Sequence, residues 1–239
     1  MYIMKLFVTF IIFSFVGYLG EVLLCSLLAK KWVNRGFLFG PLCPIYGCGG
    51  ILDVLALSGY KDNPVLIFIL GTLICGIVEY YTSYIFEKLF NNRWWDYSDR
   101  KDSINGRVSL TFLLLFGVGS LVAIYIAYPL VNYMFGYLND TIILIIGIIL
   151  AVLFIADIIG SAIIAYNLRS KLIIAEELKH EKIKLLPSLL EKKYKDQIVK
   201  IKFRTNRLLK NYPQLSKGLT KELNFIGKML DKYKSKKRQ

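Results

Sequence analysis

Long apolar stretches dominate the first 168 residues of the chain. Each one reaches or exceeds the ~20 residues that a helix needs to cross the hydrocarbon of a bilayer. The pattern therefore predicts an all-α fold, a polytopic membrane helix bundle, with a transmembrane domain over residues 1–168. We expect about five membrane spans, at residues 6–29, 41–60, 64–90, 108–135 and 140–168.

The second apolar stretch is interrupted by residues that weaken a helix. Its start, Asn34 to Gly50, reads NRGFLFGPLCPIYGCGG and contains one Arg, two Pro and five Gly. Pro removes a backbone donor, and Gly raises the entropic cost of forming a helix. In hydrocarbon, backbone groups freed in this way need partners in protein or in a water-filled cavity. We therefore predict that this segment packs against other helices and lines a polar cavity.

Positive charge is concentrated at the C-terminal end. The chain has a net charge of +14; residues 169–239 carry 21 Lys and Arg against 7 Asp and Glu, while residues 1–168 carry 10 of each sign. The positive-inside rule places such a tail in the cytoplasm. With five spans the N-terminus is then outside, and the basic loop 91–107 is inside.

The basic tail, residues 169–239, is predicted to form amphipathic cytoplasmic helices. Its apolar residues alternate at spacings of four and three, a pattern typical of a helix seam, on both sides of Pro213. The two seams pack either on each other or on a protein partner. We expect the basic faces to lie near anionic lipid, which contributes ~1 kcal/mol per basic residue close to the surface. Nucleic acid is not expected as a partner, because no recognised binding motif accompanies the charge.

Four carboxylates lie inside the predicted spans at similar depths. They are Glu21, Asp53, Glu79 and Asp157. Each lies about 8–12 residues from the cytoplasmic end of its span, or ~12–18 Å at ~1.5 Å per residue. A lipid-facing carboxylate costs a few kcal/mol, whereas four at one depth can share a polar cavity. Small or polar residues recur every four positions from Gly71 to Ser83, through Cys75 and Glu79, so this stripe is predicted to face the bundle.

The sequence leaves the partner of these acids open. No Lys or Arg lies within the spans at their depth, and Arg35 and Arg107 stand at the inner edge. Three arrangements are open. In the first, the acids are protonated and hydrogen-bonded; in the second, the Arg side chains reach them; in the third, a cationic ligand or a proton is their partner. Their role is then to hold helices together, to serve transport of a proton or solute, or to catalyse a reaction as a carboxylate pair.

Motifs for enzymatic chemistry are missing from the sequence. The cysteines, Cys25, Cys43, Cys48 and Cys75, lie in apolar segments without a CxxC pair, and the single His, His180, lies in the tail. We therefore predict no metal site and no enzyme activity. The sequence also contains no Walker GxxxxGK(S/T) loop, so no cofactor is expected, and ATP would act only through a separate ATPase partner.

The loop before the fourth predicted span reads NNRWWDYSDRKDSINGR, from Asn91 to Arg107. Aromatic residues are typical of helix ends at a membrane interface, but the interleaved charges are not needed for anchoring. Together with NRGFLFGPLCPIYG, EYYTSYIFEKLF, NGRVSL and NYPQL, this loop resembles the Putative ABC-transporter type IV family of bacterial membrane proteins. The resemblance covers nearly the whole chain and implies a permease whose substrate is not known. Its motif positions are Glu21, Asn34, Arg35, Gly36, Gly40, Pro41, Pro44, Tyr46, Gly47, Glu79, Glu87, Trp94, Trp95, Asp96, Tyr97, Asn105, Gly106 and Arg107.

The expected function is that of a permease subunit in the bacterial cytoplasmic membrane. A polar vestibule would face the cytoplasm, with Glu21, Asp53, Glu79 and Asp157 inside it and Arg35 and Arg107 at its mouth. The alternatives are a proton- or cation-coupled secondary transporter or ion pathway, a membrane-embedded enzyme, and a scaffold that recruits partners through its tail. A lone transporter of five spans would be expected to form a homo-oligomer.

Overall fold

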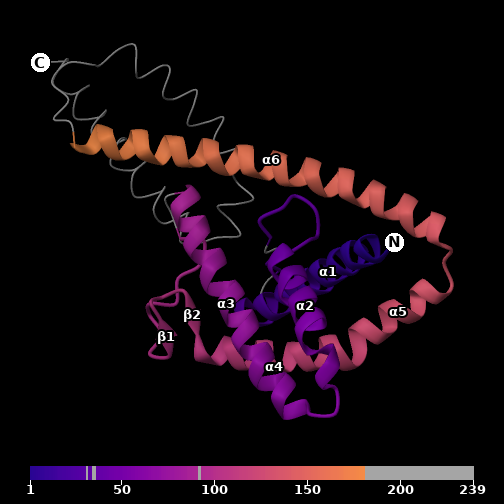
Figure 1. Cartoon of the computed structure of the whole chain (residues 1–239). Helices are drawn as coiled ribbons and strands as arrows, with labels where there is room; N and C mark the ends of the chain where they lie inside the picture. Colours follow the sequence, from indigo (N-terminus) through magenta and orange to yellow (C-terminus); the bar gives the residue numbers. More distant parts are fainter. Residues whose placement is uncertain (31, 34–35, 91–92, 181–239) are drawn as a thin grey trace, which may run out of the picture. The chain divides into compact units, whose positions relative to one another are not determined.

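The computed structural model describes residues 1–30, 32–33, 36–90 and 93–180, with the side chains of 28–29 and 167–180 left undescribed. The described part is mostly helical (Figure 1), as the apolar pattern predicts. Two candidate residues, Asn34 and Arg35, and most of the predicted tail lie outside the described residues.

The helices and strands follow one another closely along the chain. They are α1 (Tyr2–Ala29), α2 (Pro44–Leu57), the short 3₁₀ helix η1 (Ser58–Tyr60), α3 (Pro64–Phe90), β1 (Ser103–Ile104), β2 (Val108–Ser109), α4 (Leu110–Val122), the π-helical turn η2 (Ala123–Ala127), α5 (Tyr128–Gly136) and α6 (Asp140–His180). Within the described residues, four helical stretches are long and apolar enough to cross a membrane: Tyr2–Leu27, Pro64–Phe90, Leu110–Gly136 and Asp140–Tyr166.

The second predicted span forms a shorter helix than the sequence suggests. Helix α2 has 14 residues, or about 21 Å, which is less than the hydrocarbon thickness of ~30 Å. Its start is fixed by Pro44, which occupies the first helical turn, where a missing N–H is tolerated. The count of five spans and the orientation that depends on it remain predictions.

The fourth span contains a π-helical turn. Helix α4, η2 and α5 follow one another without a break from Leu110 to Gly136 (Figure 1). Pro129 has no N–H to donate to the carbonyl four residues earlier, and a π turn directly before it accommodates the missing bond.

Two compact units make up the chain. The first comprises Met1–Ile85 and Trp95–Ser161, and the second comprises Phe86–Trp94 and Ala162–Gln239. Helix α6 continues without interruption past residue 168, where we place the start of the tail. That boundary remains a prediction.

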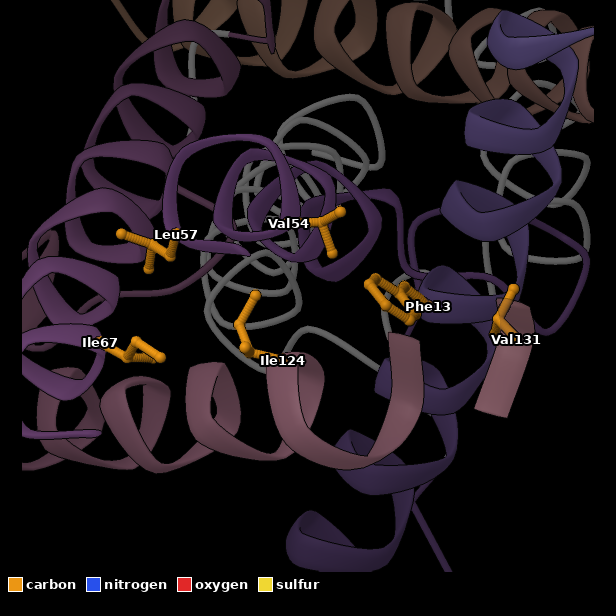
Figure 2. Packing of buried hydrophobic residues seen from close by; sticks show 6 residues of the cluster. All are labelled: Phe13, Val54, Leu57, Ile67, Ile124 and Val131. Carbon is orange, nitrogen blue, oxygen red and sulfur yellow. The ribbon is translucent and has the colours of Figure 1, made fainter. Parts of the chain in front are cut away.

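The apolar core of the first unit surrounds the short helix α2. Figure 2 shows its six side chains, which extend from Leu57 and Ile67 through Val54 and Ile124 to Phe13 and Val131. They come from α1, α2, α3, η2 and α5. Helix α2 is therefore packed against other helices, as the interrupted segment predicts.

Glycines bring α1 and α2 into close contact. A Cβ at Gly17 would overlap the Cβ and Cγ atoms of Tyr46, and a Cβ at Gly47 would lie 2.7 Å from the backbone oxygen of Phe10. The amide of Cys43, just before α2, donates to the backbone oxygen of Ser14 at 3.0 Å. The start of α2 is thus fixed against the middle of α1.

Gly17→Ala is expected to destabilise the protein by about 1–3 kcal/mol, because the added methyl group meets the stem of Tyr46 rather than a flexible end. Gly20→Ala is the matched control on the same helix, since its Cβ would meet nothing within 4 Å. That control should be neutral or stabilising by up to about 1 kcal/mol. Unfolding titrations in mixed micelles measure both, and equal stability of the two variants would contradict the close contact.

Candidate functional site

Glu21 on α1 and Tyr46 on α2 form the first polar pair. The Tyr46 hydroxyl donates a hydrogen bond to Oε2 of Glu21. The Cys25 thiol, one turn further along α1, donates to Oε1 at 3.7 Å. Because Gly17 lies one turn before Glu21, its missing side chain lets the tyrosine cross α1 at this level.

The loop after α3 folds back on itself as a hairpin. Strands β1 and β2 pair antiparallel, with Ile104 opposite Val108. Asn105 and Gly106 have φ values of 53° and 70°, and the Arg107 amide donates to the Ile104 oxygen at 3.0 Å. Two central residues with positive φ are the signature of a type I′ turn, which Asn-Gly favours. The NGR sequence is therefore a turn signal.

The WWDYS sequence is bound to this turn. The Tyr97 amide donates to the Gly106 oxygen at 2.8 Å, and the Trp95 indole donates to the Arg107 oxygen at 3.0 Å. Asp96 accepts hydrogen bonds from the Ser98 amide and hydroxyl at 3.0 and 2.6 Å. We call residues 95–109 the motif hairpin.

Arg107 and Asn105 bind the motif hairpin to α3. The Arg107 guanidinium donates to the Ser83 hydroxyl at 3.4 Å and lies over the rings of Tyr80 and Tyr84, at 5.7 and 5.3 Å from their centroids. The Asn105 amide group donates to the Tyr80 hydroxyl at 3.1 Å. Arg107 is buried, with 9% of its surface exposed, so it anchors the hairpin rather than projecting into solvent.

Glu79 and Tyr97 form the second polar pair. The Tyr97 hydroxyl donates to Oε1 of Glu79 at 3.3 Å, and the tyrosine ring stacks on Phe112 at 5.1 Å. Glu79 is only 4% exposed, and its Oε2 has no hydrogen-bond partner among the described residues. Among the described residues, the motif hairpin thus supplies the hydrogen-bond donor to this carboxyl.

The two Glu–Tyr pairs are neighbours. Glu21 lies near enough to Glu79 for their carboxyls to interact electrostatically, and Tyr46 lies likewise near Tyr97. On α4, Phe112 stacks on Tyr97 and Phe116, one turn further, meets the edge of Tyr46 at 6.2 Å. We call Glu21, Tyr46, Glu79 and Tyr97 the Glu–Tyr site.

Asp53, on α2, contacts the same stripe of α3. It is 1% exposed, and the Cys75 thiol donates to its Oδ2 at 3.6 Å. Ser120 on α4 is 3.9 Å from the Cys75 sulfur, and a Cβ at Gly71 would overlap the Ser120 side chain. Gly71, Glu79 and Ser83 are buried, which confirms that the stripe faces the bundle.

Asp157 has a different environment. Its two oxygens accept hydrogen bonds from the Phe39 and Gly40 amides at 2.7 Å each, and the Ser161 hydroxyl donates to Oδ1 at 3.1 Å. A Cβ at Gly40 would lie 2.8 Å from Oδ2, so glycine leaves room for the carboxylate. Asp157 thereby fixes the backbone of the segment that leads to α2.

The remaining motif residues have structural contacts. Gly36 is buried, and a Cβ there would lie 3.4 Å from the Tyr18 ring, whereas Pro41 is exposed. In the second compact unit, Trp94 packs against Phe86 and Phe90 at 5.7 and 5.6 Å. There too Arg93 and Glu87 form an ion pair at 3.2 Å.

Sequence reasoning missed several residues of the site. Phe112, Phe116 and Ser120 were not among the predicted site residues, although all three lie in the fourth predicted span. Cys75 was predicted on the polar stripe of α3, but its contact with Asp53 did not follow from the sequence. Among the described residues, no group of three His, Cys, Asp or Glu side chains could hold a metal ion.

Asp102 stabilises the junction between the motif hairpin and α4. Its carboxylate accepts hydrogen bonds from the Ser109 hydroxyl at 2.7 Å and from the Thr111 hydroxyl and amide at 2.7 and 2.9 Å, and Arg100 lies at 3.1 Å. These bonds, that from Ser109 first, hold the pKa of Asp102 well below its usual value.

Acidification is therefore expected to open the motif hairpin. A lowered pKa means that the carboxylate stabilises the fold above the usual value of about 4, and that this contribution is lost as the pH falls through the pKa of the folded state. Trp95 fluorescence should report the opening in the wild type. Asp102→Asn should flatten this acid transition, and an unchanged pH profile in that variant would contradict the assignment.

Comparison with known proteins gives one result. A family model described as Putative ABC-transporter type IV matches residues 8–162. No curated protein and no solved structure matches the chain. The matched range includes α1 to α5, the motif hairpin and the part of α6 that carries Asp157.

Proposed function

Because the chain belongs to the Putative ABC-transporter type IV family, we propose that it is the permease subunit of an ABC-type transporter in a bacterial cytoplasmic membrane. Its Glu–Tyr site lies on the route of the transported solute and opens towards the cytoplasm. Energy comes from a separate ATPase subunit, and the chain itself carries out no enzymatic reaction. The four apolar helices make it a membrane protein, consistent with this role.

The observation that carries this proposal is the convergence of two Glu–Tyr pairs inside the helix bundle. Glu21 and Tyr46 come from α1 and α2, whereas Glu79 and Tyr97 come from α3 and the motif hairpin. Carboxylates within a membrane are costly, and they mark solute or ion pathways more often than packing contacts. Polar groups from four segments that meet at one place form a site that can bind a solute.

The position of the motif hairpin supports an opening towards the cytoplasm. It joins α3 to α4, and the positive-inside rule places this basic loop inside. Its Tyr97 hydroxyl reaches Glu79, so a movement of the hairpin would change the hydrogen bonding of the buried carboxyl. In this proposal the hairpin transmits the action of the ATPase to the site.

A second candidate function is a proton- or cation-coupled secondary transporter. The observation that favours it is Oε2 of Glu79, which is buried without a hydrogen-bond partner among the described residues. In that case the chain would need no ATPase and would be expected to form a homo-oligomer. The basic tail would hold anionic lipid in either case.

Affinity purification from native membranes separates the two candidates. The permease proposal expects an ATPase to copurify in a fixed ratio with the full-length chain, and to stay bound through washing at high salt. A complete partner inventory without any ATPase, together with gradient-driven proton or cation flux by the purified chain alone, would overturn the proposal in favour of the second candidate.

A further inference from the structure

Two buried carboxyl oxygens have no hydrogen-bond partner among the described residues. They are Oδ1 of Asp53 and Oε2 of Glu79. The two side chains are 1% and 4% exposed, so neither oxygen is hydrated from the surface of the bundle. A buried polar atom without a partner costs about 1–3 kcal/mol, and more when the group is charged. An unpartnered buried oxygen of this kind is a candidate binding atom for a proton or an ion.

Cys75 lies between the two carboxyls. Its thiol donates to Oδ2 of Asp53 at 3.6 Å, and the charges of both Asp53 and Glu79 act on it. Glu79 follows Cys75 by one turn of α3, and helical side chains lean towards the N-terminus of their helix. The Glu79 carboxyl therefore leans towards Cys75 and Asp53.

Small and polar groups surround Oδ1 of Asp53. Oδ1 of Asp53 is 3.7 Å from the position that a Cβ of Gly71 would occupy, and a larger residue there would also overlap Ser120. The Ser120 hydroxyl donates to the Phe116 carbonyl at 3.0 Å, so its oxygen still has lone pairs for a neighbouring donor. Gly71 and Ser120 thus keep the surroundings of Oδ1 small and polar.

Neither carboxyl forms an ion pair within the described residues. The guanidinium of Arg107 donates to the hydroxyl of Ser83, one turn of α3 beyond Glu79, and lies over the rings of Tyr80 and Tyr84. A carboxylate buried away from water in a medium of low dielectric constant is poorly solvated. Binding of a proton removes this cost.

We propose that Asp53 and Glu79, each linked to Cys75, are a pair of intramembrane proton-binding acids, and that protons reach them through the Glu–Tyr site and the motif hairpin. Tyr97 joins the pair to the hairpin because its hydroxyl contacts Oε1 of Glu79. The inference deepens the proposed function by adding a proton to the site, and it rests on that function only for the use made of the proton.

The titratable and charged groups of the surrounding site come from four segments. They are Glu21 on α1, Cys43 and Tyr46 at the start of α2, Cys75 on α3, and Tyr97 and Arg107 of the motif hairpin. Helix α4 contributes no titratable side chain, and Asp157 on α6 is held by the Phe39 and Gly40 amides.

Labelling with dicyclohexylcarbodiimide tests the proposal on the full-length protein in lipid nanodiscs. The O–H of a carboxylic acid adds across a C=N bond of the reagent: the carboxyl oxygen bonds to the central carbon, and the proton moves to nitrogen. An ionised carboxylate lacks that proton. Peptide mass mapping of the wild-type protein should locate the label on Asp53 or Glu79 at neutral pH. Above the midpoint of the titration, the initial rate should fall about tenfold per pH unit.

Variants and cations complete the test. Glu79→Gln and Asp53→Asn should each remove the label from the substituted position, whereas Asp62→Asn, at an exposed acid between η1 and α3, should leave the labelling unchanged. Two results would overturn the proposal. One is folded wild-type protein without label on either carboxyl from about pH 6 to about pH 9. The other is loss of the label on adding Na⁺ or K⁺ at constant pH, which would indicate a metal-cation site. Neither depends on whether an ATPase copurifies.

Discussion

Asp157→Ala is expected to destabilise the protein by about 2–5 kcal/mol, the largest effect of any single substitution considered for the fold. The substitution removes the acceptor of two backbone hydrogen bonds at 2.7 Å and leaves the Phe39 and Gly40 amides without it. Water cannot replace the carboxylate in hydrocarbon. The segment that positions Tyr46 would then lose its attachment to α6.

Unfolding titrations in mixed micelles measure this loss. The free energy of unfolding of Asp157→Asn should lie between those of the wild type and the Ala variant. A carboxamide oxygen still accepts a hydrogen bond from one backbone amide, but its NH₂ group faces the other amide and cannot accept from it. Asp140→Ala is the control on the same helix: Asp140 is largely exposed and pairs with Lys5 at 3.3 Å, so its loss should cost about 1 kcal/mol or less. A similar cost for Asp157→Ala and Asp140→Ala would show that the two backbone bonds do not hold the segment.

Arg107→Ala is expected to release the motif hairpin from α3, with a local cost of about 2–4 kcal/mol. The variant loses two cation–π contacts and the hydrogen bond to Ser83 at a buried position. The hydrogen-exchange rates of the hairpin amides should rise by the factor that corresponds to this local free-energy cost. The Trp95 emission should shift towards that of a solvated indole. Helix α1, which the substitution does not touch, should keep its protection.

Two further variants test the physical reason for this release. Arg107→Lys keeps the charge but loses the planar group that lies over the two tyrosine rings, so it should restore only part of the protection. Lys101→Ala removes an exposed charge from the same loop and should leave exchange unchanged. Full protection in Arg107→Ala would mean that the backbone bonds from Trp95 and Tyr97 suffice to hold the hairpin.

The apolar pattern predicted the long helices well, because hydropathy over ~20 residues is a local property of the chain. The four candidate spans begin and end within a few residues of the predicted ones. The stripe through Gly71, Glu79 and Ser83 also followed from periodicity, and all three are buried. The match to residues 8–162 confirms the family that the motifs indicated.

Pairings between distant segments did not follow from the pattern. Periodicity shows which face of a helix is polar, but not which residue of another helix meets it. Glu21 and Asp157 therefore read as equivalent acids, whereas one bonds to a tyrosine hydroxyl and the other to two backbone amides. The short length of α2 could not be predicted from the sequence, because the apolar composition continues on both sides of the helix.

The NGR motif shows how a local signal acquires its meaning in the fold. Asn-Gly predicts a turn with positive φ at both residues, but only the structure shows that this turn binds Tyr97 and, through Asn105, the hydroxyl of Tyr80. Sequence reasoning placed Arg107 at the mouth of a vestibule. The structure gives it a buried position against α3, where it supports the hairpin that reaches Glu79.

The measurement that tests the central claim most directly is ATP-driven movement of solutes across the membrane of vesicles with outward-facing ATPase sites. Vesicles that contain the wild-type protein with its partners are loaded with a cell extract, supplied with the same extract and ATP outside, and analysed by untargeted mass spectrometry. The account predicts that ATP raises or lowers the internal amount of at least one solute with the wild-type protein, and that it does not do so in Glu79→Gln vesicles with the same amount of folded protein and the same bound ATPase. An equal ATP-driven change of that solute in Glu79→Gln and wild-type vesicles would contradict the claim that the Glu–Tyr site lies on the transport route.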